Sequence, residues 1–244
     1  MNETCDLSNL PPLPGPLDVL VVAPHPDDAE LGMGGTISLL VSQGKRVGIL
    51  DLTSGEPTPF GSTETRRNET ATANQALGSP WRFNLGLPNR SLEPTLENRK
   101  LLASLFRLTK PKWLFAPYWE DAHPDHLAAT ELVEAARFWS KLSKTDMLGE
   151  PFHPARIFYY YCIHLKLAPQ PAFVVDISSH WDSKEKSIEA YQSQFVIGRP
   201  TPSEPFTERF REEAGFWGKT IGTRYGEPFA SREPIALMDL DSLR

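Results

Sequence analysis

The chain has 244 residues, of which 40% are hydrophobic and 23% charged, the proportions of an ordinary globular protein with a core of its own. Its net charge of −6 argues against a nucleic-acid or anionic-membrane partner, and no apolar stretch approaches the roughly 18 residues of a membrane span. Because the first residues also lack the basic and apolar regions of a signal peptide, we expect a cytoplasmic protein whose two cysteines stay reduced.

The first part of the chain alternates predicted strands and helices. Residues 1–16 are rich in proline and are expected to form an irregular lead-in. Strands are predicted at 17–23, 47–52, 81–85 and 113–116, and helices at 34–43, 65–77, 95–109 and 126–139. Gly44 and Gly78 are placed to end the first two helices. This alternation predicts an α/β, Rossmann-like fold with a mostly parallel sheet and helices on both faces.

The pattern is less regular beyond residue 149. Strands are predicted at 156–161 and 173–176, and helices at 183–194 and 208–221. Nothing in the composition marks a second domain, so residues 1–244 are expected to form a single α/β domain.

Two short motifs, His25-Pro26-Asp27-Asp28 and His123-Pro124-Asp125-His126, each follow a predicted strand. In both, a metal-capable residue comes three positions after a histidine, so a turn brings the two side chains together. Ligands of parallel sheets sit beyond the carboxyl ends of the strands, so the topology places both motifs in one crevice. Histidine and aspartate suit Zn²⁺, and three protein ligands with an open fourth position indicate a catalytic site.

The residues alone leave the role of each motif member open. With Asp28 as a ligand, Asp27 would be the general base for a metal-activated water, but Asp27 could also be the ligand and Asp28 the helix cap. Either His123 or His126 would complete the site. The other histidine, held protonated by Asp125 or Asp121, would stabilise an oxyanion or protonate a leaving amine. Of the remaining histidines, His164 is the best placed to line the pocket.

In their context the two motifs resemble those of the LmbE-like (PIG-L) N-acetylglucosaminyl deacetylases, a family of zinc hydrolases. The resemblance rests on residues 23–32 and 121–126, and residues 61–69 match the family's second helix. Segments 173–176, 191–195 and 221–229, together with Lys184, resemble the branch that deacetylates N-acetylglucosaminyl-malate in bacillithiol biosynthesis.

The resemblance implies a role for each motif residue. One Zn²⁺ per chain would be held by His25, Asp28 and His126. Asp27 would be the general base, and His123, oriented by Asp125, would stabilise the transition state. The resemblance further implies that Arg66 and Glu69 contact the sugar, and that the chain forms a trimer or hexamer.

Two departures from the family pattern bear on the non-sugar half of the substrate. Ser54-Gly55-Glu56 stands where many relatives have an Arg-Gly pair, and Asn89 stands where many have aspartate. The expected activity is removal of the acetyl group from a small N-acetylglucosamine-containing substrate, with N-acetylglucosaminyl-malate as the candidate.

Two other functions compete with deacetylation. Hydrolysis of another bond, such as a phosphoester, usually needs a second metal ion or a basic phosphate clamp, and the sequence shows no second ligand cluster. A sugar-binding module with a structural metal would not need Asp27 or His123, and both are present.

Overall fold

The computed structural model describes residues 7, 10–164, 169–199 and 205–237. In this part of the chain, seven strands form one sheet in the order β3-β2-β1-β4-β5-β7-β6. The strands are β1 (Val19–Ala23), β2 (Val47–Thr53), β3 (Trp81–Leu87), β4 (Trp113–Pro117), β5 (Arg156–Tyr160), β6 (Phe173–Asp176) and β7 (Gly226–Ala230). The first five pair in parallel, whereas β7 runs antiparallel to both β5 and β6. The α/β class and the mostly parallel sheet are therefore confirmed.

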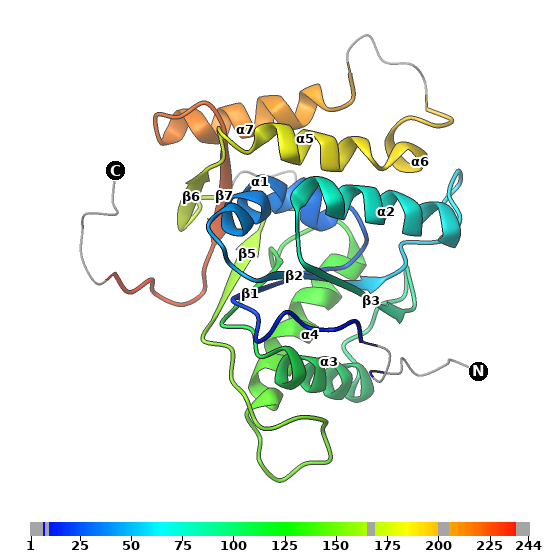
Figure 1. Cartoon of the computed structure of the whole chain (residues 1–244), viewed down its shortest axis with the longest axis vertical. Helices are drawn as coiled ribbons and strands as arrows, with labels where there is room; N and C mark the ends of the chain where they lie inside the picture. The colour runs from blue at the N-terminus through cyan, green and yellow to red at the C-terminus, as the bar shows by residue number, and fades with distance from the viewer. Residues whose placement is uncertain (1–6, 8–9, 165–168, 200–204, 238–244) are drawn as a thin grey trace.

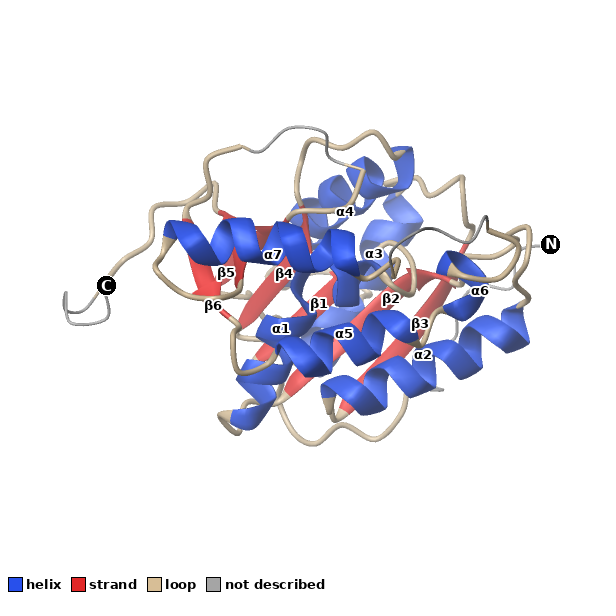
Figure 2. Ribbon diagram, turned by 90° about the horizontal axis from the view of Figure 1, so that it is seen from above, coloured by secondary structure: helices blue, strands red, loops and turns tan. Residues whose placement is uncertain are grey.

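Helices cover both faces of the sheet (Figure 1). One face carries α3 (Leu96–Thr109) and α4 (Pro124–Ser140), and the other carries α1 (Asp28–Ser42), α2 (Thr63–Leu77), α5 (Trp181–Glu189), α6 (Gln192–Phe195) and α7 (Glu208–Thr220). Viewed from above, α5 lies between α7 and α2 (Figure 2). Every residue of β1 and β2 is buried, as expected for strands covered on both faces.

Most of the predicted elements are present with shifted ends. Gly44 and Gly78 follow α1 and α2 with φ of 75° and 74°, the left-handed conformation predicted for residues that end a helix. The helix predicted at 183–194 is divided into α5 and α6. The irregular lead-in lies partly outside the described residues, and residues 10–16 contain no helix or strand.

One predicted boundary was wrong, and one strand was not predicted. The helix predicted to begin at Gly34 begins at Asp28, so the turn of the first motif leads directly into α1, with Asp27 as its N-cap and Asp28 as its first residue. Strand β7 was not predicted, because Pro228 interrupts its apolar pattern. The pairing of β7 with β5 covers Phe229 and Ala230. Pro228 precedes these two residues, so its missing N–H costs no hydrogen bond to β5.

Two further expectations concern the described part of the chain. None of its helices combines the length and apolar character needed to span a bilayer. Cys162 is a buried free thiol, and Cys5 lies outside the described residues.

Candidate active site

The two motifs meet at the carboxyl edge of the sheet, between neighbouring strands. Strand β1 ends at Ala23, two residues before His25, and β4 pairs with β1 in parallel. Helix α4 follows β4 and has His123 as its N-cap. Strand order reverses between β1 and β4, and this is where open α/β sheets bind their ligands.

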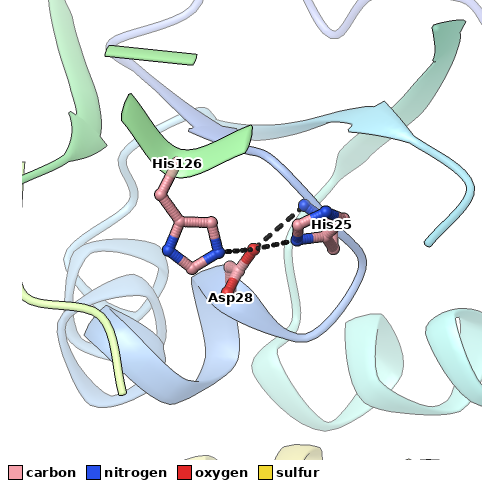
Figure 3. Close-up of side chains that lie close together, drawn as sticks. All are labelled: His25, Asp28 and His126. Carbon is pink, nitrogen blue, oxygen red and sulfur yellow. Dashed lines mark hydrogen bonds and ion pairs between the residues drawn. The ribbon is translucent and has the colours of Figure 1, made fainter. Parts of the chain in front are cut away.

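Three side chains converge on one point in this crevice (Figure 3). Oδ2 of Asp28 lies 3.0 Å from Nδ1 of His25 and 3.3 Å from Nε2 of His126. Metal–ligand bonds of about 2.0–2.1 Å place the ligands of a tetrahedral zinc roughly 3.3 Å apart. The three donor atoms, which all lie within 4.8 Å of one another, therefore fit a single divalent ion.

The far nitrogen of each histidine faces a carboxylate. Nε2 of His25 lies 3.0 Å from Oδ2 of Asp125, and Nδ1 of His126 lies 3.2 Å from Oδ2 of Asp121. The second contact is an ion pair without hydrogen-bond alignment. Carboxylates in this position fix the ring orientation and tautomer of metal-binding histidines. Asp121 was not predicted to support a ligand.

The structure corrects the expected partner of Asp125. Its carboxylate binds His25 and accepts the backbone N–H groups of Arg90 and Leu92, at 2.8 and 3.2 Å. His123 contacts Asp125 through the main chain instead, since its Nδ1 accepts the backbone N–H of Asp125 at 3.2 Å. Asp125 thus contacts His25 through its carboxylate and His123 through its backbone N–H.

The charges in the cluster favour an ionised Asp28. Burial would raise the pKa of Asp28, but His126 and His25 beside it hold that pKa well below its usual value. Burial would likewise lower the pKa of His126, yet Asp28 and Asp121 raise it. Such a buried cluster keeps a carboxylate charged only because cationic groups surround it, and a divalent ion would serve the same purpose.

Asp27 points away from the three donors, as the motif predicted. Its φ of 116° is rare for a residue other than glycine and indicates backbone strain. Its Oδ2 accepts a hydrogen bond from Nη1 of Arg66 at 3.1 Å. Burial raises the pKa of Asp27 to about 7, although Arg66 acts in the opposite direction. A carboxylate with this pKa is suited to exchange a proton near neutral pH.

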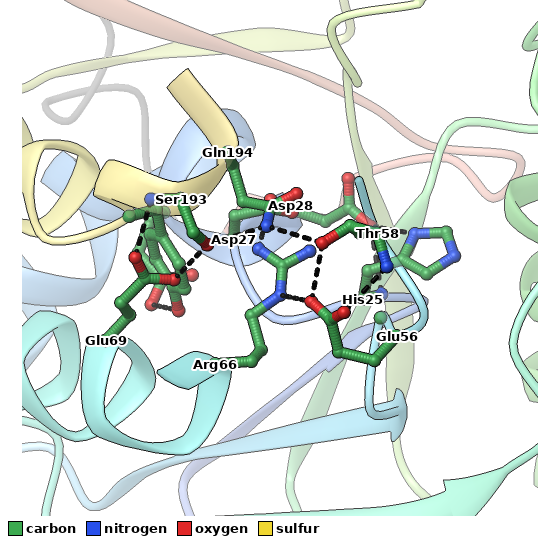
Figure 4. A network of polar contacts seen from close by, with 12 residues as sticks. His25, Asp27, Asp28, Glu56, Thr58, Arg66, Glu69, Ser193 and Gln194 are labelled. Atoms are coloured by element: carbon green, nitrogen blue, oxygen red, sulfur yellow. Dashed lines mark hydrogen bonds and ion pairs between the residues drawn. The ribbon is translucent and has the colours of Figure 1, made fainter. Parts of the chain in front are cut away.

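Arg66 belongs to a polar network that extends away from Asp27 (Figure 4). Its Nε lies 3.7 Å from Oε1 of Glu56, and Glu56 accepts hydrogen bonds from the backbone and hydroxyl of Thr58. Thr58 in turn accepts from Gln194 at 3.2 Å. Arg66 is only 4% exposed. It lines the pocket as expected, but its guanidinium faces two carboxylates of the protein.

The carboxylate of Glu69 contacts α6, whereas the resemblance implied a contact with the sugar. Its two carboxylate oxygens accept hydrogen bonds from the backbone N–H and the hydroxyl of Ser193, at 2.7 and 2.8 Å. Glu69 is not among the described residues that line the pocket. It binds α6 instead, and so fixes the neighbouring Gln194 and Phe195, which do line the pocket.

The pocket above the cluster has a volume of about 260 Å³. Besides the motif residues it is lined by side chains that the motifs did not indicate, namely Thr58, Asn89, Arg90, Ile163, His164, Gln194, Phe195 and Arg199. The ring of His164 lies 5.6 Å from that of His123, which confirms its predicted position in the pocket. Gln194 and Arg199 could not be predicted because no local pattern shows that α6 packs over the site.

The fold and the cluster define an α/β protein with a His/Asp/His centre of the kind that holds a metal ion. The family model described as PIG-L, GlcNAc-PI de-N-acetylase, matches residues 20–137. A diacetylchitobiose deacetylase of Thermococcus kodakarensis is 30% identical over 230 residues, covering 86% of this chain and 80% of the relative. The chain therefore belongs to the PIG-L family of deacetylases.

Two further relatives differ in what their names describe. A probable N-acetyl-alpha-D-glucosaminyl L-malate deacetylase 2 of Bacillus cereus is 30% identical over 191 residues, covering 72% of this chain and 83% of the relative. The crystal structure of a conserved protein from Thermus thermophilus, TT1542, has a TM-score of 0.83 and 41% identity, covering 91% of this chain and 97% of that one. The family resemblance is confirmed. The bacillithiol branch is only weakly supported, because the diacetylchitobiose deacetylase is 30% identical over 230 residues and the malate deacetylase is 30% identical over 191.

Proposed function

We propose that this protein is a zinc-dependent hydrolase that removes the N-acetyl group from an N-acetylglucosamine-type sugar. The observation that carries the proposal is the convergence of His25, Asp28 and His126, with the paired Asp27 beside them. Membership of the PIG-L family supports the amide bond and the sugar. A bound zinc ion would polarise the acetyl carbonyl and lower the pKa of a water beside it.

Asp27 and His123 take the proton-handling roles in this proposal. Asp27 accepts a proton from the attacking water and returns it to the departing sugar amine, so the carboxylate is regenerated. Nδ1 of His123 accepts a backbone N–H, so the ring proton of neutral His123 is on Nε2. Burial and the neighbouring His126 and His25 lower the pKa of His123, which favours this neutral form. Its Nε2–H then stabilises the oxyanion.

Hydrolysis of a phosphoester is less well supported. Every group of three metal-capable side chains found among the described residues contains His25 or His126. The described residues therefore contain no ligand cluster independent of the proposed site, and a two-metal mechanism has no second site to support it.

For the rest of the substrate, we propose an anionic group such as the malate of N-acetylglucosaminyl-malate. Arg90 and Arg199 are exposed and line the pocket, so they offer cations at its mouth. Two other arginines are less suited to bind an anionic group. Arg66 is paired with Asp27 and Glu56, and Arg224 does not line the pocket but lies over the ring of Tyr225. The Bacillus cereus relative named for a malate-containing substrate adds support.

An amine-release assay on a panel of N-acetylglucosaminides tests both parts of the proposal. We expect activity with zinc bound, and a higher kcat/KM for the malate glycoside than for a neutral glycoside. Arg199→Gln should narrow that difference, whereas Arg224→Gln, outside the pocket, should not. Added salt should narrow it as well by screening the cations. Equal kcat/KM values at low ionic strength would refute the proposal of an anionic substrate group but not the deacetylase activity. Absence of amine release from every substrate would refute both proposals.

A further inference from the structure

Helix α1 is broken five residues after Asp28. Met33 has φ −150° and ψ 25°, values outside the helical range, so a short first segment carries Asp28 and a second segment runs on to Ser42. In a regular helix, the N–H of Gly35 would donate to the carbonyl of Leu31. At the break these two backbone groups have other partners, and both partners are charged.

A buried ion pair occupies the gap in the helix. Gly35 donates its N–H to Oε1 of Glu227 at 3.0 Å, and Nζ of Lys184 donates to the carbonyl of Leu31 at 2.8 Å. Lys184 and Glu227 are themselves 2.6 Å apart and are 4% and 2% exposed. Glu227 also accepts the N–H and the hydroxyl of Thr36, at 2.7 and 2.6 Å. The pair therefore satisfies the backbone on both sides of the break.

The residues around the break pack closely against neighbouring elements. A Cβ on Gly32 would overlap the ring of Tyr160, and one on Gly35 would overlap the side chain of Ile177. The hydroxyl of Tyr160 donates to the carbonyl of Val22 in β1 at 3.0 Å. The short first segment thus lies close to β1 and β5, with Asp28 at its beginning, beside the end of β1.

We propose that Lys184 and Glu227 are positioning residues for the metal ligand Asp28. The pair comes from α5 and β7, far from the motif in sequence, and it sets the direction of the segment that carries Asp28. This inference rests on the proposed metal site. An ion pair that served only to stabilise the core would affect unfolding without any specific effect on metal binding.

The experiment compares zinc affinity with stability in three variants. Lys184→Met and Glu227→Gln each leave a buried partner unsatisfied, and the double variant leaves no unpaired charge. Without the pair, the N–H of Gly35 can form the regular helical hydrogen bond to the carbonyl of Leu31. This change would straighten the helix and turn Asp28 away from the two histidines. Arg107→Met is the matched control, because Arg107 is also a buried cation bound to backbone carbonyls, those of Ser140, Leu142, Met147 and Gly149, on the opposite face of the sheet.

Zinc Kd is measured by competition with a chelator, and unfolding by thermal denaturation of the metal-free protein. We expect each of the three variants to raise Kd about tenfold or more, as loss of outer support for a metal ligand does. The double variant should regain part of the unfolding temperature but none of the affinity, and the absorption spectrum of bound Co²⁺ should change. Arg107→Met should lower the unfolding temperature and leave Kd within about twofold, since it lies far from the proposed ligands.

Two results would overturn the inference. The first is a folded double variant with the Kd and Co²⁺ spectrum of the natural protein. The second is a loss of affinity in Arg107→Met as large as in the pair variants. If Lys184→Met does not fold, Glu227→Gln decides the question, since it keeps an acceptor oxygen at the break. A natural protein that binds no zinc would instead refute the proposed function itself.

Discussion

The guanidinium of Arg66 donates a hydrogen bond to the carboxylate of Asp27 over 3.1 Å, although 39 positions separate the two residues. The ion pair gives the carboxylate of Asp27 a fixed partner in the pocket, at a residue whose φ of 116° indicates backbone strain. We therefore propose that Arg66 supports the proposed base, whereas the resemblance implied a contact with the sugar.

Arg66→Met should therefore lower kcat by about tenfold or more with a small change in KM. The reason is that Asp27 loses its orientation, whereas substrate binding is unaffected. Zinc content should stay the same, and Arg66→Lys should recover part of kcat. Steady-state kinetics of both variants test this. A raised KM with normal kcat would show that Arg66 contacts the sugar and does not support the base.

Asp27→Asn should keep zinc and lose activity by about 10²-fold or more, the typical cost of removing a general base. Asp28→Asn should lose both, because an amide is a poor zinc ligand. Metal analysis and amine release on the two variants separate the roles. If Asp27→Asn emptied the site while Asp28→Asn kept its zinc, base and ligand would have to be exchanged.

Removing any one of the three donors should empty the site, so His25→Ala, Asp28→Ala and His126→Ala are each expected to lose zinc. Asp121→Asn and Asp125→Asn should weaken zinc binding by about 10–100-fold, since each carboxylate faces the far nitrogen of a ligand histidine. Elemental analysis and chelator competition measure these losses. A full equivalent of zinc in any two of the alanine variants would refute the ligand set.

Glu69→Gln should destabilise the protein by about 1–3 kcal/mol, because it weakens two hydrogen bonds from Ser193 to a buried carboxylate. KM should rise, because the displaced residues next to Ser193 line the pocket, whereas kcat should change little. Glu64→Gln, exposed on the same helix, is the control. A fall in kcat with unchanged stability would show that Glu69 acts on the substrate after all.

Glu233 gives a prediction about pH. A hydrogen bond from Arg137, with the charge of Arg156, lowers the pKa of Glu233 below its usual value of 4.5. A lowered folded-state pKa means that the ion pair stabilises the protein above pH 4.5 and that this contribution is lost as pH falls through the lowered value. Glu233→Gln should cost at most about 1 kcal/mol near neutral pH, since the side chains are partly exposed, and nothing once the pH is below the lowered pKa. Urea unfolding of both proteins, near neutral pH and below the lowered pKa, measures the difference in free energy of unfolding.

The motifs and the alternation of strands and helices were enough to predict where the site lies. His25 and Asp28 follow a strand that is buried on both faces, and the parallel order brings His126 to the same edge. What local pattern missed depends on tertiary packing. Gly32 and Gly35, for example, allow Tyr160 and Ile177 to approach α1 closely, and neither partner is near them in sequence.

The contacts of Glu69 and Arg66 were beyond the sequence for a similar reason. Both lie on α2, where the family motif suggested a pair of sugar contacts, but their partners come from three other segments. Segment 192–199 binds Glu69 through Ser193 and contributes Gln194, Phe195 and Arg199 to the pocket lining. That segment has no periodicity of its own, since α6 is only four residues long.

The donors that converge on Oδ2 of Asp28 come from segments about 100 positions apart, so an ion bound there would also act as a cross-link between the first and fourth strand–helix units. Folding and metal loading would then be a single linked equilibrium, because the unfolded chain keeps none of this geometry. At a free metal concentration of about 100 Kd the linkage amounts to about 2.7 kcal/mol, a large fraction of the stability of a typical domain. The free metal concentration would then affect the stability of the folded protein as well as its activity.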